Sequence, residues 1–225
     1  MGQAIGNTLS MAIGVAISPV PIIAVVLMLG TPRARTNGLA FAAGWLVGLT
    51  VVGAAVLIAA NGNATTSTGQ PATWVSVLKL LFGVLFLLLA AHSWRGRPRA
   101  GQEAPMPKWM QTIDEFGAAK SLGMGVLLSA VNPKNLALTA AAAAAIAQTD
   151  IPGGQQAVAL AVFILIGSLT ILVPVVIYFA MGAKAKHILD EINQFMAAHN
   201  AAIMTVLFLV LGAKLIGDAI AGFSA

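Results

Sequence analysis

The chain has 225 residues, of which 59% are hydrophobic and only 8% are charged. A soluble globular domain carries about 25% charged residues, so this chain cannot cover itself with a polar surface and is expected to be an integral membrane protein. It contains no cysteine, which excludes disulfides and thiolate metal sites. The net charge of +5 gives no reason to expect a nucleic-acid partner, because the basic residues fall in short clusters between apolar runs.

Six apolar runs are each long enough to cross the hydrocarbon core of a bilayer, which takes about 20 residues. The first run has no basic residue before it and is too long for a signal-peptide core, so we do not expect it to be cleaved. The sequence predicts an all-α integral membrane protein with six transmembrane helices. In chain order the predicted spans are Ile5–Leu29, Gly38–Ala60, Trp74–Trp94, Ser121–Ala147, Gln156–Met181 and Ala201–Ala221.

Lysine and arginine residues are confined to alternate connections between these spans. The first connection contains Arg33 and Arg35, the fifth contains Lys184 and Lys186, and the long third connection is also basic. The second and fourth connections contain neither lysine nor arginine. By the positive-inside rule, connections one, three and five are cytoplasmic and both termini face outside. We therefore predict a multi-pass protein of the plasma membrane in this orientation.

The first and fourth spans are each interrupted near their centre by a step that contains a polar residue and proline. The first span contains Ser18, Pro19 and Pro21 in GVAISPVP, and the fourth contains Asn132 and Pro133 in GVLLSAVNPKN. A proline inside a helix removes a backbone donor and costs about 3 kcal/mol or more. Unwound backbone at membrane depth is tolerated where protein buries it or where it lines a cavity. The two breaks therefore predict a central substrate site, with simple proline kinks as the alternative.

The two halves of the chain resemble each other beyond these breaks. Residues 85–92 read LFLLLAAH and residues 207–214 read LFLVLGAK, at corresponding places near the end of each half. Three spans per half would insert the second copy upside down relative to the first, which is a recurring plan of secondary transporters. The predicted units are a first three-helix repeat at residues 1–95, a cytoplasmic linker at 96–120 and a second repeat at 121–225.

Lys134 follows the second break near the centre of the fourth span. An ionised side chain at this depth costs about 2.5–3.5 kcal/mol on insertion scales and normally faces a partner inside the bundle. It could meet an anionic substrate group or titrate during transport, or it could be a structural lysine bound by carbonyls freed at the breaks. No acidic residue lies at a comparable depth. Lys214 and Asp218 are interpreted as a structural pair near the end of the last span.

No catalytic or metal-binding pattern is visible in the sequence. It contains no nucleophile elbow, no HExxH and no P-loop, and the spans contain no cluster of histidine and acidic residues. We therefore expect neither an enzyme nor a bound metal or cofactor. An ATP-driven pump is excluded for this chain alone.

Small residues predict close helix packing at two places. Gly44 and Gly48 form a GxxxG step, and residues 138–148, LTAAAAAAIAQ, are nearly all alanine. Both patterns allow neighbouring helices to approach closely. A smooth surface on which helices slide is the alternative reading of the alanine run.

Two stretches closely resemble the Sap/GAP group of the LysE transporter superfamily, founded on the sulfolipid- and glycopeptidolipid-addressing proteins of actinobacterial envelopes. They are residues 18–49, SPVPIIAVVLMLGTPRARTNGLAFAAGWLVGL, and residues 132–135, NPKN. The resemblance covers essentially the whole chain and implies two inverted triplets of spans with proline motifs in spans one and four. Carried over residue by residue, the implied substrate-binding residues are Ser18, Pro19, Pro21, Asn132, Pro133, Lys134 and Asn135.

The resemblance implies a part in moving a cell-envelope glycolipid across the plasma membrane. Our first hypothesis is an exporter of a lipid or lipid-like substrate that works by alternating access at the midplane. An exporter of a small polar solute or ion is the second. The third is a non-transporting scaffold that recruits a larger lipid exporter through the linker, where Trp109 and Phe116 could form a short interfacial helix. Substrate identity, coupling ion and homo-oligomer formation stay open.

The predicted orientation can be tested by cysteine labelling. A cysteine at Thr66 should react with an impermeant thiol reagent added to intact cells, whereas a cysteine at Gly101 should be shielded by the membrane. The native chain has no cysteine, so labelling reports the introduced residue alone. Labelling of Gly101 in sealed cells would overturn the orientation and, with it, the inverted repeat.

Overall fold

The computed structural model describes residues 1–61, 73–97, 108–149 and 151–224, and every regular element in these residues is a helix. The labelling positions Thr66 and Gly101, and the middle of the predicted linker, lie outside the described residues. The elements in chain order are α1 (Gly2–Ala16), α2 (Pro19–Leu29), α3 (Ala34–Asn61), α4 (Thr73–Arg95), η1 (Lys108–Glu115), α5 (Ala118–Val126), η2 (Leu127–Val131), α6 (Pro133–Ala147), α7 (Gly153–Met181), η3 (Gly182–Lys184) and α8 (Ala185–Ser224).

Four of the described helices, α3, α4, α7 and α8, are long and apolar enough to cross a membrane. Helices α1 and α2 together make a fifth candidate, bent by 53° where they meet. The predicted fourth span is divided between the short apolar stretch Ala118–Val131 and α6. The protein is therefore an all-helical, multi-pass membrane protein, and the sixth span stays a prediction.

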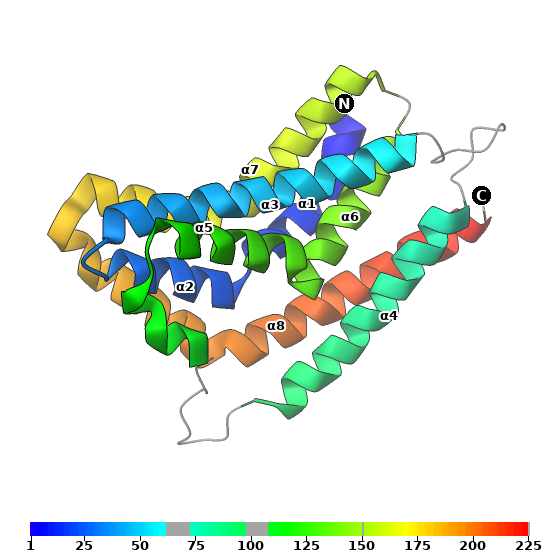
Figure 1. The fold of residues 1–225 in the computed structure, drawn as a ribbon. Coiled ribbons are helices and arrows are strands. Elements are labelled where there is room, and N and C mark those ends of the chain that lie inside the picture. Colours follow the sequence, from blue (N-terminus) through cyan, green and yellow to red (C-terminus); the bar gives the residue numbers. More distant parts are fainter. Residues whose placement is uncertain (62–72, 98–107, 150, 225) are drawn as a thin grey trace.

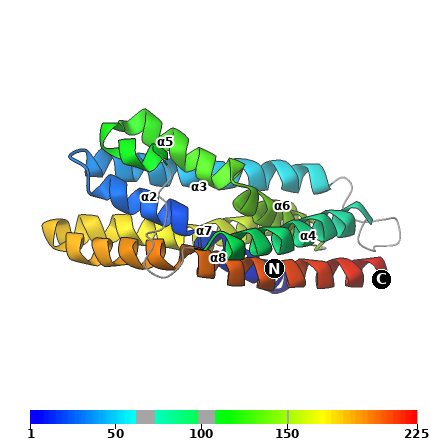
Figure 2. The same ribbon diagram turned by 90° about the horizontal axis from the view of Figure 1, so that it is seen from below.

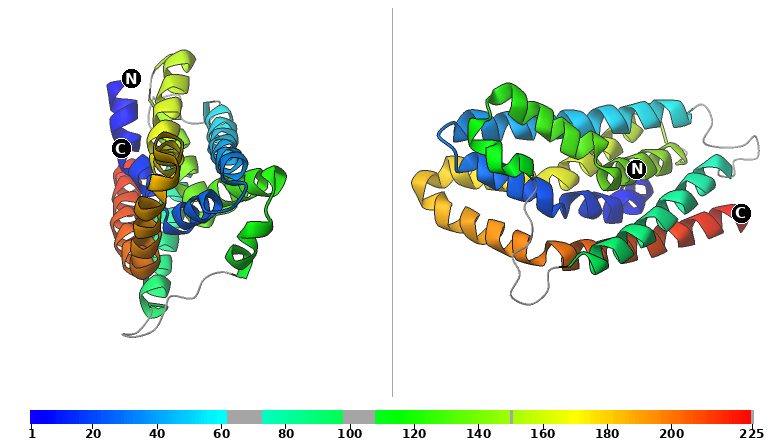
Figure 3. Two further views of the ribbon diagram at one scale, coloured as in Figure 1. Left: turned by 90° about the vertical axis from the view of Figure 1, so that its left-hand side faces the viewer. Right: turned by 60° about the horizontal axis from the view of Figure 1, so that its bottom comes forward.

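The helices form a bundle with two sides. Helix α4 runs alongside α8 over most of its length, as the views in Figures 1 and 3 agree. Helices α3 and α5 pack together on the opposite side, with α2 between them and the α7–α8 side (Figure 2). Helix α1 packs on α6 and α7. Ser18 and Lys134, which lie at the two breaks, are consequently buried inside the bundle.

The first break falls where the sequence predicts it. Helix α1 ends at Ala16 and α2 begins at Pro19, which occupies the first helical position. Proline is suited to that position because its fixed φ angle is already helical and its missing N–H would have no intrahelical partner there. The proline pair thus ends one helix and starts another rather than kinking a continuous one.

The second break is a π-helical turn followed by a capped helix start. Helix α5 runs into η2, and the chain leaves the helical path at Asn132. The Asn132 side chain accepts a hydrogen bond from the backbone N–H of Lys134 at 3.0 Å, and Pro133 opens α6. Side-chain capping of this kind satisfies one of the free donors at a helix start. The local chemistry of Asn-Pro therefore sets where α6 begins.

The last helix is longer than the predicted span. The sequence analysis begins this span at Ala201, whereas α8 is a single helix of 40 residues that starts at Ala185. Between η3 and residue 201 the chain contains neither glycine nor proline, and His187 and Glu191 form an (i, i+4) pair at 3.6 Å. The polar residues before position 201 therefore continue the same helix beyond its apolar part.

The end of the linker folds onto the protein. Residues 108–115 form the short helix η1, and the side chains of Met110, Ile113 and Phe116 are buried. The Asn37 side chain of α3 donates a hydrogen bond to the Phe116 carbonyl at 2.9 Å. The interfacial-helix interpretation is therefore corrected for Phe116, because its ring packs against the bundle. The Trp109 side chain lies outside the described part of the chain.

Glycines let α3 and α5 approach closely. A Cβ atom on Gly44 would lie 2.1 Å from the Leu122 carbonyl oxygen, and one on Gly125 would lie 2.3 Å from the Phe41 carbonyl oxygen. Backbone atoms cannot move away as a flexible side chain can. The close-packing interpretation of the GxxxG step is consistent with this contact.

Gly125→Ala should therefore destabilise the protein, by about 1–3 kcal/mol as for other overpacked sites. Gly123→Ala is the matched control, because it lies on the same helix and its added Cβ would meet nothing within 4 Å. Thermal unfolding in detergent micelles measures both changes. Equal midpoints for the two variants would contradict the close approach of α3 and α5.

Candidate functional site

The two breaks are joined by Lys134. Its side chain is only 3% exposed, and its ammonium group donates hydrogen bonds to the Gly14 carbonyl at 2.8 Å, the Ile17 carbonyl at 2.7 Å and the Ser18 hydroxyl at 2.6 Å. An ammonium group has three donors, so all of them are used. The first residues of α6 thus bind the unwound end of α1, more than 100 positions earlier in the chain.

The carbonyl acceptors at the first break are those that have lost their helical donors. In a continuous helix the carbonyls of Val15 and Ile17 would accept from residues 19 and 21, which are prolines without an N–H. The Ser18 N–H turns to the Ala16 carbonyl instead of Gly14. Lys134 donates to the Gly14 and Ile17 carbonyls, and the Ser18 hydroxyl donates to the Val15 carbonyl at 2.6 Å.

The second break is satisfied in the same way. In the π-helical turn, the Leu127 carbonyl accepts from the Asn132 N–H at 3.2 Å, and the Leu128 carbonyl would accept from residue 133, which is proline. The buried Asn135 side chain supplies the missing donor to Leu128 at 2.9 Å. Its Oδ1 lies 3.3 Å from the Ser18 hydroxyl, which connects the two breaks a second time.

A cavity of about 200 Å³ lies at this junction. Five of the seven predicted site residues line it, whereas Pro133 is exposed and Asn135 is buried behind it. The cavity also receives Asn200 and Met204 from α8, and Oδ1 of Asn200 is buried without a hydrogen-bond partner. The residues that line the cavity are Ser18, Pro19, Val20, Pro21, Asn132, Lys134, Asn200 and Met204.

Sequence reasoning missed two polar contributors to this site. Asn200 lies one residue before the predicted sixth span and was therefore left in a connection. Thr170, in α7, donates a hydrogen bond from its hydroxyl to the Ala16 carbonyl. Nothing in the neighbouring sequence shows that a polar residue faces a break in another helix. A single asparagine at the border of an apolar run, such as Asn200, could nevertheless have been considered as a site residue.

Comparison with known protein families finds one family model that matches most of the chain. Residues 8–221 match the family model described as Sap, sulfolipid-1-addressing protein. The chain belongs to this family. No curated protein and no solved structure matches it significantly. With its several apolar helices, this Sap-family protein is a multi-pass membrane protein tied to lipid handling.

The break cavity of the Sap-family protein has a positive character. Lys134 has no carboxylate within ion-pair distance among the described residues. Helices α2 and α6 both begin at this cavity, and the N-terminal end of a helix carries a partial positive charge. The cavity is thus suited electrostatically to a polar or negatively charged group, with Asn200 as a further hydrogen-bonding side chain.

A larger apolar groove of about 620 Å³ runs between α1 and α8 beside this cavity. Gly14 and Ile17 line the groove, and their carbonyl groups bind Lys134 on the other side. The rest of its lining is almost entirely aliphatic or aromatic. The residues are Ser10, Ile13, Gly14, Ile17, Phe195, His199, Ala202, Ile203, Val206, Leu207, Val210 and Leu211.

Replacement of Lys134 by methionine should lower stability, because it leaves three buried acceptors without their ammonium donor. The expected loss in the free energy of unfolding is about 1–3 kcal/mol, the usual cost of leaving a buried polar group unpaired. Unfolding of the purified protein in detergent measures it. Lys186→Met is the matched control, since Lys186 is an exposed residue near the start of α8. Equal stability of wild type and Lys134→Met would show that the carbonyls do not depend on the lysine.

Proposed function

We propose that this protein is a transporter, working as an exporter, that takes part in translocating a cell-envelope glycolipid or a similar lipid across the plasma membrane. The substrate site is the break cavity, and transport proceeds by alternating access around it. Membership of the sulfolipid-addressing family supports the link to lipid. The proposal places both termini outside and assigns the chain to the LysE superfamily.

The helix contacts support an arrangement of six spans in two inverted triplets. If α1–α2, α3 and α4 correspond to α5–α6, α7 and α8, the contact of α1 with α7 corresponds to that of α5 with α3. The contact of α2 with α3 likewise corresponds to that of α6 with α7, and α4 packs on α8. Such paired contacts are expected of an inverted repeat. In this arrangement Ala118–Ala147 is the broken fourth span.

The observation that carries the proposal is the position of the apolar groove beside the polar break cavity. A lipid has a polar headgroup and apolar chains, so it needs two adjoining sites of different chemistry. The cavity offers a headgroup the positive charge of Lys134 and the side chains of Asn132 and Asn200, and the groove offers an apolar surface along α1 and α8. Opening of the cavity toward the groove would admit the substrate from the membrane.

Export of a small polar solute or ion is the second candidate function, and the modest cavity volume of about 200 Å³ favours it. The adjoining groove has no role in that mechanism, which is why we rank it below lipid transport. A scaffold that recruits a larger lipid exporter is the third candidate. The burial of Met110, Ile113 and Phe116 leaves less of the linker available for a partner.

The proline breaks can be tested by converting them to continuous helix. Pro19→Ala combined with Pro21→Ala returns N–H donors to the Val15 and Ile17 carbonyls, so α1 and α2 can join and the cavity is lost. Proteoliposomes that contain an acyl-NBD-labelled glucosyl diacylglycerol are treated with dithionite, with and without a proton gradient. Wild type should expose the inner-leaflet probe, and the double variant should leave it protected.

Pro174→Ala is the control, because Pro174 lies inside α7 and outside the break cavity. It should retain transport. Full transport by the Pro19/Pro21 double variant would remove the breaks from the substrate site. Absence of transport by wild type, together with co-purification of a larger exporter, would favour the scaffold function.

A further inference from the structure

A second polar cavity, of about 420 Å³, lies where α1, α4, α6 and α8 meet. It shares no lining residue with the break cavity and belongs to the end of the bundle where α1 begins and α8 ends. Its polar side chains come from α1, α4, α8 and the two residues that follow α6. The lining residues are Gln3, Asn7, Met11, Lys79, Ala145, Gln148, Thr149, Lys214, Asp218, Ala221 and Gly222.

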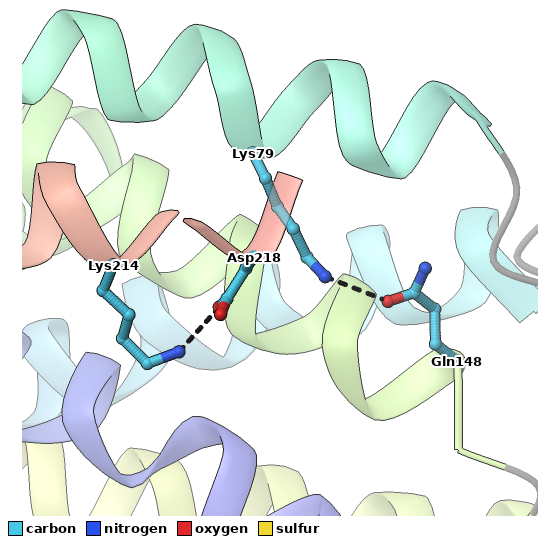
Figure 4. Close-up of polar contacts among 4 residues, drawn as sticks. All are labelled: Lys79, Gln148, Lys214 and Asp218. Atoms are coloured by element: carbon cyan, nitrogen blue, oxygen red, sulfur yellow. Dashed lines mark hydrogen bonds and ion pairs between the residues drawn. The ribbon is translucent and has the colours of Figure 1, made fainter. Parts of the chain in front are cut away.

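The positive and negative side chains that line this cavity are unequal in number. Two ammonium groups, on Lys79 and Lys214, face one carboxylate, on Asp218. Figure 4 shows that the Lys214 ammonium is directed at Asp218, to which it is 2.6 Å away. Lys79 has no carboxylate within ion-pair distance among the described residues. With all three groups ionised, these side chains carry one more positive than negative charge.

Donors of this cavity are left without acceptors. The Lys79 ammonium donates one hydrogen bond, to Oε1 of Gln148 at 3.3 Å (Figure 4). An ammonium group has three donors, so two donors of Lys79 have no acceptor among the described residues. Because Oε1 of Gln148 accepts from Lys79, its Nε2 is the donor end of the amide, and this atom is buried without a partner. An unpaired buried donor is costly, which marks this place as one that a ligand would complete.

We propose that this cavity binds a small oxyanion of the sulfate or phosphate type, between the ammonium groups of Lys79 and Lys214 and Nε2 of Gln148. Such an anion would neutralise the excess charge and accept from the free donors. A metal cation fits poorly, because two ammonium groups repel it and the single carboxylate is already bound to Lys214. The anion is either free in solution or the headgroup of a lipid, and the site is independent of the proposed transport site.

The test is anion-dependent stability of the purified full-length protein in an uncharged detergent. Sodium sulfate should raise the unfolding temperature above that in sodium chloride of equal ionic strength, because a ligand that binds only the folded state stabilises it. Lys79→Gln should weaken sulfate binding by about tenfold or more, as expected for loss of a charged hydrogen-bond donor. Lys79→Arg should retain most of the binding. Lys186→Gln, which removes the same charge from an exposed position, should not alter it.

Asp218→Asn should change the sulfate affinity in the opposite direction to Lys79→Gln. Among the described residues it removes the one carboxylate that lines the cavity, and it releases Lys214, so sulfate should bind more tightly, by severalfold. A purely structural ion-pair network predicts lower stability of this variant and no gain in sulfate affinity. The sign of this change also keeps the proposal testable should Lys79→Gln fail to fold.

Mixed micelles containing phosphatidylglycerol or phosphatidylcholine distinguish the two sources of the anion. Stabilisation by phosphatidylglycerol that Lys79→Gln abolishes supports a lipid headgroup, whereas a response to sulfate alone supports a free anion. Absence of any sulfate- or phosphatidylglycerol-specific stabilisation in wild type would overturn the proposal. Equal responses of wild type, Lys79→Gln and Asp218→Asn would also overturn it.

Discussion

The binding of the Lys134 ammonium to the open end of α1 is the interaction on which the centre of the molecule depends. Prolines at positions 19 and 21 deprive the Val15 and Ile17 carbonyls of their helical donors, and in a membrane no water replaces them. A buried ammonium group is equally costly without acceptors. Each break supplies what the other lacks, so neither is tolerable without the other.

This reciprocity explains how an otherwise apolar bundle contains a polar centre. Helices α2 and α6 both begin at the junction, and their N-terminal ends add to the positive character of the cavity. A groove of apolar side chains adjoins it along α1 and α8. The second cavity has a different origin, because it is made by charged side chains of α4 and α8 rather than by unwound backbone.

Local sequence patterns predicted the helices well and their polar extensions poorly. The breaks fall at the predicted prolines because proline acts on its own backbone and on the residue four positions earlier. The start of α8 and the packing of η1 were not predicted. The first depends on polar residues that continue an apolar helix, and the second on a surface of α2 and α3 that buries Phe116.

By itself the sequence determined that the chain lies in a membrane, where its helices break, and that Lys134 has no acidic partner nearby. These follow from composition and from chemistry within a few residues. Only the tertiary structure decided which carbonyls bind Lys134, that Asn200 faces the same cavity, and that Lys79 shares a site with Gln148 and Asp218. Such pairings depend on how helices far apart in the sequence pack against one another. The periodicity of a sequence predicts which face of a helix is buried, but it does not predict which helix covers that face.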